Sequence, residues 1–124
     1  MKEAFAALAL MTPAALPEGG LDALRWEARP ILVFAETGDA RLDRQLSLFA
    51  ANADDLRERR NIVVVDRAPG SALRARFRPE GFAVVLVGLD GGEKFRSGEV
   101  VDPDRIDALI DRMPMRRREL REGG

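Results

Sequence analysis

Three unbroken apolar runs interrupt an otherwise charged chain, and each has the length of a β-strand. They cover residues 31–35, 62–65 and 82–87. Because neither face of such a run is polar, the pattern predicts strands that are buried on both faces, as in a sheet covered by helices. A fourth segment, residues 93–100, alternates charged and apolar positions around Phe95 and predicts a strand with one face in water.

Between the first two runs, apolar residues recur at helical spacing. They are Leu42, Leu46, Phe49, Ala53 and Leu56. Their spacing of three or four positions predicts one helix of about four turns with a single apolar face. Asp39 is a good N-cap for this helix because its carboxylate can accept hydrogen bonds from free backbone N–H groups.

Capping residues indicate two further helices. Ser71 is placed to cap a short helix that ends near Phe77. Asp102 precedes Pro103, and a proline directly after an N-cap aspartate is typical of a helix start. Pro114 is expected to stop or kink this last helix.

The order of the elements predicts the topology. A helix joins the first two strands, so we expect them to be parallel through a right-handed crossover. The Asp90-Gly91 turn makes the last two strands an antiparallel hairpin. The predicted fold class is α/β, a thioredoxin-like small mixed sheet of four to five strands with helices on both faces.

The chain divides into three regions. We expect the domain to cover residues 21–113, followed by a basic, exposed tail at residues 114–124. Residues 1–20 form either a weak signal peptide or a flexible segment, because Lys2, a short uncharged Ala/Leu stretch and small residues follow one another as in a secretory signal. No segment reaches the roughly 20 apolar residues that a membrane span requires.

The residue types that are missing limit the chemistry. The 124 residues contain no cysteine, which excludes disulfides, thiolate metal sites and thiol chemistry. They contain no histidine, the commonest general base and metal ligand. The net charge is −1 and the basic excess lies in the tail, whereas phosphate binding needs a broad basic face. We therefore expect no metal, no cofactor and no nucleic-acid partner.

Four segments carry a resemblance to a known family. They are residues 26–35, residues 78–88, Asp90-Gly91-Gly92 and residues 110–119, within which Met-Pro-Met-Arg-Arg-Arg-Glu at 113–119 is the most specific piece. On these segments the chain resembles an uncharacterised bacterial thioredoxin-like family, a domain of unknown function, over residues 21–121. Related domains occur in the vertebrate sushi-repeat-containing extracellular proteins.

The resemblance implies a thioredoxin-like fold and brings no established reaction. Bacterial members of the family are often exported, so it also implies a periplasmic or otherwise exported protein. A cytoplasmic location is the alternative.

The thioredoxin redox site lacks its chemical groups in this sequence. It would lie after the first strand, at residues 36–41, and its chemistry needs thiols. The cis-proline of thioredoxins would fall near Phe82-Ala83, where no proline stands. We therefore expect no enzyme activity and no catalytic residue. The predicted function is a non-catalytic thioredoxin-like binding or interaction domain with a protein partner of unknown identity.

Three surfaces are candidate contacts for that partner. They are the helix N-terminus with Thr37, Gly38, Asp39 and Arg41, the loop with Phe82 and Ala83, and the basic tail with Arg116, Arg117 and Arg118. Free N–H groups at a helix N-terminus can bind an anion, and clustered arginines can meet an acidic partner. The alternatives are ordinary capping by Asp39 and a solvated tail.

Other interpretations stay open. A small carboxylate-dependent enzyme would use Glu36 and Asp39, which would then titrate abnormally and line one cleft. A purely structural or oligomerising module is a third function, and the sequence leaves the oligomeric state open. Met113 and Met115 form an apolar docking spot or pack onto the sheet. Trp26 is expected to be a lid over the sheet edge.

Overall fold

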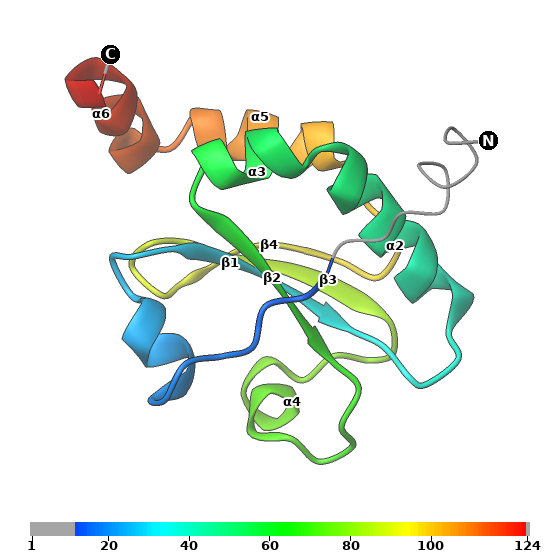
Figure 1. The fold of residues 1–124 in the computed structure, drawn as a ribbon. Coiled ribbons are helices and arrows are strands. Elements are labelled where there is room, and N and C mark those ends of the chain that lie inside the picture. The colour runs from blue at the N-terminus through cyan, green and yellow to red at the C-terminus, as the bar shows by residue number, and fades with distance from the viewer. Residues whose placement is uncertain (1–11, 124) are drawn as a thin grey trace.

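A computed structural model describes residues 12–123, and Figure 1 shows their arrangement. The elements are η1 (Gly20–Leu24), β1 (Arg29–Phe34), α2 (Ala40–Ala51), α3 (Ala53–Glu58), β2 (Asn61–Asp66), α4 (Ala72–Phe77), β3 (Ala83–Val87), β4 (Glu93–Ser97), α5 (Pro103–Asp111) and α6 (Pro114–Gly123). The predicted signal-like pattern at the N-terminus lies largely outside the described residues.

The four strands form one mixed sheet in the order β2-β1-β3-β4. β1 and β2 are parallel, whereas β1 pairs with β3, and β3 with β4, in antiparallel fashion. The predicted parallel pairing of the first two strands and the predicted hairpin are both confirmed. The predicted fold class is confirmed as a small α/β sheet of four strands, and the arrangement is consistent with a small thioredoxin-like fold.

Helices cover both faces of this sheet. Figure 1 shows α2, α3 and α5 on one face and η1 and α4 on the other. Successive residues of β1 point to opposite faces, so Ile31 and Val33 pack with the first group while Leu32 and Phe34 pack with the second. Every residue of β1 and β3 is buried, which explains why residues 31–34 and 83–87 are unbroken apolar runs.

Capping side chains set where three of the helices begin. Asp39, Ser71 and Asp102 each accept a hydrogen bond from a backbone N–H in the first turn of the helix that follows. The three predicted N-caps are therefore confirmed. In each case the polar side chain satisfies a donor that has no partner within its own helix.

The predicted four-turn helix is two helices instead of one. α2 ends at Ala51 and α3 begins at Ala53, with Asn52 between them in a non-helical conformation. The Asn52 amide donates to the carboxylate of Asp107 on α5 at 2.9 Å, so a contact with another element stabilises the break. Leu56 remains buried, and the apolar face therefore continues through the break.

A buried glutamine ties α2 to the segment that leads into α5. Gln45 is fully buried, and its amide nitrogen donates to the carbonyl of Val101 at 2.9 Å. Its amide oxygen accepts from the Val101 N–H at 2.7 Å. The Gln45 amide thus pairs with the backbone N–H and carbonyl of Val101 as a neighbouring strand would. Without it, these two backbone groups would be buried without hydrogen bonds.

Trp26 was predicted to be a lid over the sheet edge, and the structure shows a different arrangement. Its side chain is 54 % exposed. The backbone is left-handed at this residue, with φ 69°, and the Trp26 N–H donates to the carbonyl of Leu89 at 2.7 Å. This bond ties the turn after η1 to the end of β3, while the indole remains largely in solvent.

The C-terminal region also differs from its prediction. Residues 114–123, predicted to be a basic, exposed tail, form helix α6, and Pro114 is its first residue. Proline suits this position because the first N–H of a helix has no intrahelical partner and the ring fixes a helical φ. Pro114 therefore separates α5 from α6 without ending helical structure in the chain.

Candidate functional site

A polar cleft opens where β1 ends and α2 begins. Its volume is about 530 Å³, and its lining residues are Arg41, Arg78, Glu80, Gly81, Phe82, Ala83, Arg96, Ser97 and Gly98. The structure therefore brings together two of the predicted contact surfaces, the start of α2 through Arg41 and the loop at Phe82 and Ala83. Thr37 and Gly38 are exposed nearby but do not line the cleft.

Asp39 and Arg41 form a closed pair at the start of α2. Asp39 caps the helix through the N–H of Arg41, and the Arg41 guanidinium donates to both carboxylate oxygens at 3.0 and 2.8 Å. The side-chain hydrogen bond from Arg41, followed by the backbone one, lowers the pKa of Asp39. The carboxylate is thus held in its charged form, and the N-terminal N–H groups have the capping partner that the alternative prediction expected.

Arg41 also covers the floor of the cleft. Its guanidinium lies 5.0 Å from the centroid of the Phe82 ring, within the range of a cation–π contact. Phe82 itself is buried. The predicted residues Arg41 and Phe82 therefore form one unit in which a cation lies above an aromatic ring at the start of β3.

Two arginines that the sequence analysis did not single out complete the cleft. Arg96 donates to the carbonyl of Phe77 at 2.6 Å and to the carboxylate of Glu93 at 2.9 and 3.0 Å. Arg78 has left-handed backbone with φ 51° at the end of α4. Its side chain is exposed, and no ion pair joins it to any residue between 12 and 123.

The charge of the cleft follows from this lining. Three arginines face it, and Glu80 is the single acidic residue in the lining. Asp39 and Glu93 pair with Arg41 and Arg96, so Arg78 is the lining arginine that no ion pair joins to a residue between 12 and 123, and its charge is the one placed to attract an anion. The arrangement can therefore bind a carboxylate or a similar anion over an aromatic floor.

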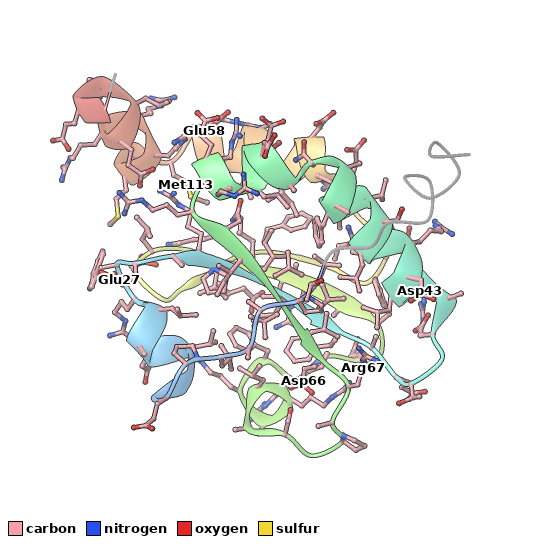
Figure 2. The ribbon with its side chains drawn as sticks, in the orientation of Figure 1. Glu27, Asp43, Glu58, Asp66, Arg67 and Met113 are labelled. Carbon is pink, nitrogen blue, oxygen red and sulfur yellow. The ribbon has the colours of Figure 1, made fainter. Side chains whose placement is uncertain are left out.

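The third predicted contact surface, the C-terminal arginines, is built differently. Arg116 is 4 % exposed and contributes to a cluster at the end of the molecule where α3, α5 and α6 meet, near Glu58 and Met113 in Figure 2. Its guanidinium donates to Glu58 at 3.0 Å, to Asp111 at 3.3 Å and to Glu119 at 3.5 Å. The prediction that Arg116 lies in an exposed tail is therefore wrong.

Glu119 links this cluster to the sheet. It accepts two hydrogen bonds from Arg29, at 3.3 and 3.0 Å, and Arg29 is only 1 % exposed. Such a two-pronged pair is geometrically specific because the planar guanidinium matches the carboxylate. Arg29 begins β1, so the pair connects residues 90 positions apart in the chain.

We call this cluster the α6 clamp. It consists of Arg29, Arg59, Arg116, Glu58, Asp111 and Glu119. Arg116 and Glu119 share a helix face because they are three positions apart. Arg117 and Arg118 lie on the exposed side of α6. The three arginines predicted to act together therefore divide into one buried structural residue and two exposed ones.

The described residues contain neither a metal-binding group of carboxylates nor a helix that could cross a membrane. Within residues 12–123, no group of three or more aspartate or glutamate side chains is arranged to hold a metal ion. Within the same residues, no helix combines the length and the apolar character needed to cross a membrane.

Comparisons with known proteins identify a family and no individual relative. The model of a family described as a domain of unknown function (DUF4174) matches residues 20–119. This range covers all of the sheet and the α6 clamp. No curated protein and no solved structure matches the chain.

The α6 clamp predicts that the three consecutive arginines at residues 116–118 contribute unequally to the free energy of unfolding. Arg116→Ala removes a buried guanidinium together with its hydrogen bonds to Glu58, Asp111 and Glu119, and should lower the free energy of unfolding by about 2–4 kcal/mol. Arg117→Ala and Arg118→Ala should change it by less than about 0.5 kcal/mol. Urea unfolding of the three variants measures this, and equal effects at the three positions would contradict the clamp.

The α6 clamp also predicts a loss of stability in acid. Burial raises the pKa of Glu119, but the hydrogen bonds and charge of Arg29 outweigh burial, so the pKa lies below its usual value. A carboxyl whose pKa is lower in the folded state stabilises the fold fully above its unfolded pKa, near 4.5. That contribution disappears as the pH falls through the folded value.

Glu119→Gln should therefore be about 2–3 kcal/mol less stable than the native chain at pH 7, and this difference should shrink below about pH 4. Glu122→Gln, on the exposed side of the same helix, is the matched control and should show a small difference at every pH. Unfolding curves between pH 7 and pH 2.5 measure both. A Glu119→Gln difference that does not depend on pH would refute the assignment.

Proposed function

The chain belongs to the family described as a domain of unknown function (DUF4174), and we propose that it is a thioredoxin-like domain that binds a protein partner without catalysing a reaction. The strand order β2-β1-β3-β4, with one parallel and two antiparallel pairings, supports the thioredoxin-like part of this proposal. The resemblance at residues 113–119 supports a relation to bacterial exported domains and to those of the sushi-repeat-containing proteins.

The observation that carries the binding proposal is the arginine-lined cleft beside the start of α2. Arg41 is held by Asp39 and Arg96 by Glu93, so their positions are fixed before a ligand arrives. Arg78 is exposed at the rim. A preorganised site loses less conformational entropy on binding than a flexible one. The ligand that fits this lining is a segment of a partner protein that carries carboxylates.

The absence of catalysis is part of the same proposal. The sequence offers no thiol and no imidazole. A carboxylate-dependent reaction at Glu36 and Asp39 would need a carboxylate free to exchange a proton, whereas the Asp39 carboxylate is bound by Arg41 and its pKa is lowered. This engagement favours a capping role for Asp39 over a role as acid or base.

Site-specific photocrosslinking in cells tests the cleft. Gly98 lines it and is exposed, and a Cβ at this position would meet only the carbonyl of Phe82 at an ordinary 3.8 Å, so a benzophenone amino acid can be introduced there without a clash at its Cβ. We expect crosslinking from position 98 to a discrete partner that mass spectrometry identifies. The same amino acid at Asp54, which is exposed on α3, should give no such adduct.

Charge reversal supplies the decisive control. Arg78→Glu should reduce the adduct at least fivefold, because reversing a rim charge slows association with an acidic ligand. Arg67→Glu makes the same charge change at an exposed position outside the cleft and should leave the adduct unchanged. An adduct that survives Arg78→Glu, or none at all from position 98, would remove the cleft from the proposal.

We also propose that the protein is exported, because its first twenty residues have a pattern like that of a secretory signal. Cleavage after Ala15 would remove the backbone bond from the Ala14 N–H to Val63 on β2. Sequencing the N-terminus of the protein isolated from its host should then find a chain that begins near residue 16. An N-terminus at residue 1 or 2 would argue for the cytoplasmic alternative.

A further inference from the structure

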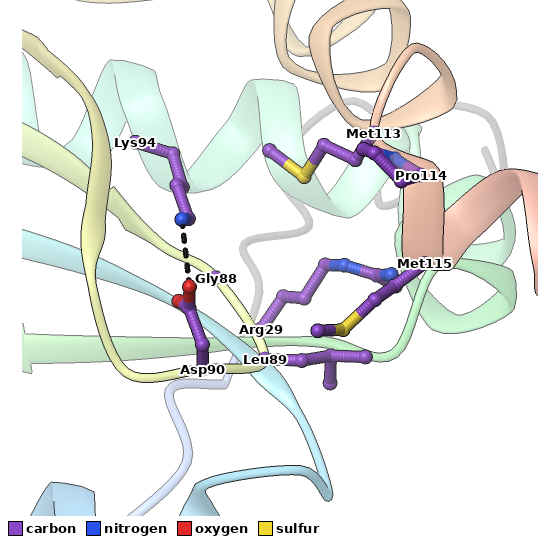
Figure 3. Close-up of a pocket in the computed structure, with 8 residues that line it drawn as sticks. All are labelled: Arg29, Gly88, Leu89, Asp90, Lys94, Met113, Pro114 and Met115. Atoms are coloured by element: carbon purple, nitrogen blue, oxygen red, sulfur yellow. Dashed lines mark hydrogen bonds and ion pairs between the residues drawn. The ribbon is translucent and has the colours of Figure 1, made fainter.

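A second hollow lies at the opposite end of the sheet from the arginine-lined cleft. It has a volume of about 270 Å³ and is lined by Arg29, Gly88, Leu89, Asp90, Lys94, Met113, Pro114 and Met115. Figure 3 shows that these residues come from the start of β1, the β3–β4 hairpin and the junction of α5 and α6. We call it the methionine hollow.

Two methionines form one side of the methionine hollow. Met113 precedes Pro114, Met115 follows it, and both side chains extend toward the hairpin that carries Leu89 in Figure 3. Methionine is unbranched and polarizable, so such side chains adapt to apolar groups of different shape. The hollow therefore has an apolar, adaptable wall rather than a rigid one.

One residue that lines the methionine hollow has a buried polar atom with no hydrogen-bond partner within residues 12–123. Arg29 lines the hollow and is 1 % exposed, and its Nε has no hydrogen-bond partner in the part of the chain that the structure describes. The two terminal nitrogens of the same guanidinium are held by Glu119 and by the carbonyl of Arg59. A buried N–H left unpaired is costly, and a bound acceptor would remove that cost.

Helix α6, which begins at the methionine hollow, has a predominantly basic exposed surface. Arg117, Arg118 and Arg121 are exposed on this helix against one exposed acid, Glu122. Arg118 lies one helical turn after Pro114 and Met115 and therefore on the face that borders the hollow. On the hairpin side, Lys94 and Asp90 form an ion pair with an N–O distance of 3.0 Å, so their two charges neutralise each other (Figure 3).

An exposed aromatic residue is bonded through its backbone to a residue that lines the hollow. Trp26 donates its backbone N–H to the carbonyl of Leu89, which lines the hollow, and its indole is 54 % exposed. Its left-handed backbone is unfavourable for a bulky residue. Such strain persists only where the surroundings hold it, and it gathers at binding sites.

We propose that the methionine hollow is a docking site for an acidic segment of another protein, which inserts one large apolar side chain beside Met113 and Met115 and places carboxylates against Arg118. A volume of about 270 Å³ has room for one large apolar side chain. Buried anchors surrounded by polar contacts are the usual source of affinity at protein interfaces. The exposed arginines of α6 favour an acidic segment over a basic one.

Methionine methyl NMR tests this proposal on the full-length chain. The chain has four methionines, and methyl-¹³C labelling gives one signal for each. The probe is a synthetic twelve-residue peptide with a single leucine between two pairs of glutamates in an otherwise Gly/Ser sequence. We expect the signals of Met113 and Met115 to shift with saturation, and the same peptide with serine for leucine to cause no shift.

Variants separate the methionine hollow from other sites. Arg118→Glu, an exposed change, should weaken peptide binding at least fivefold, whereas Arg67→Glu, which lies at the other end of the molecule in Figure 2, should change it less than twofold. Arg78→Glu alters the arginine-lined cleft and should leave these shifts intact. A failure of the cleft proposal can therefore be told apart from a failure of this one.

Three results would overturn the proposal. The first is that Met113 and Met115 do not respond to the leucine peptide at millimolar concentration. The second is an equal response to a peptide with lysines in place of the glutamates. The third is that the same two signals shift with protein concentration alone while light scattering reports a dimer, because the hollow would then be occupied by a second copy of the chain.

Discussion

The pair between Arg29 and Glu119 is the constraint on which one end of the molecule depends. A guanidinium that is 1 % exposed loses most of its hydration, and only a well-aligned charged partner offsets that loss. The partner is on α6, so β1 cannot bury its first residue unless the last helix is in place. Helix α6 is therefore a structural part of the sheet end, and Arg116 reinforces the connection through α3 and α5.

Local patterns in the sequence predict much of the fold, and long-range pairs account for what they miss. The unbroken apolar run of β1, the Asp90-Gly91 turn and the N-cap at Asp39 each depend on residues close together in the chain. Arg116 follows no such rule, because three consecutive arginines have the composition of a solvated surface. One of the carboxylates that bind it, Glu58, is 58 positions away in the chain. The break at Asn52 is likewise tied to a contact with another helix.

The residues that line the arginine-lined cleft also divide into some that the sequence predicts and some that it does not. Arg41 and Phe82 could be predicted, because the end of β1 and the start of β3 must be adjacent once the two strands are antiparallel neighbours. Arg78 and Arg96 could not, since they reach the cleft from the end of α4 and from β4, and no spacing in the sequence relates them. Arginines are common throughout this chain, so only their convergence in space distinguishes those that line the cleft.

Because the α6 clamp is made of ion pairs, it also determines which side chains of α6 are exposed at this end of the sheet. An apolar contact would hold α6 in several orientations, whereas a planar guanidinium paired with a carboxylate fixes its rotation. A shift of one residue along a helix turns each side chain by about 100°. With Arg116 and Glu119 fixed inward, Met115 is directed at the β3–β4 hairpin and Arg118 at its border. The buried ion pairs thus fix the rotation of α6, and this rotation determines where Met115 lies in the methionine hollow.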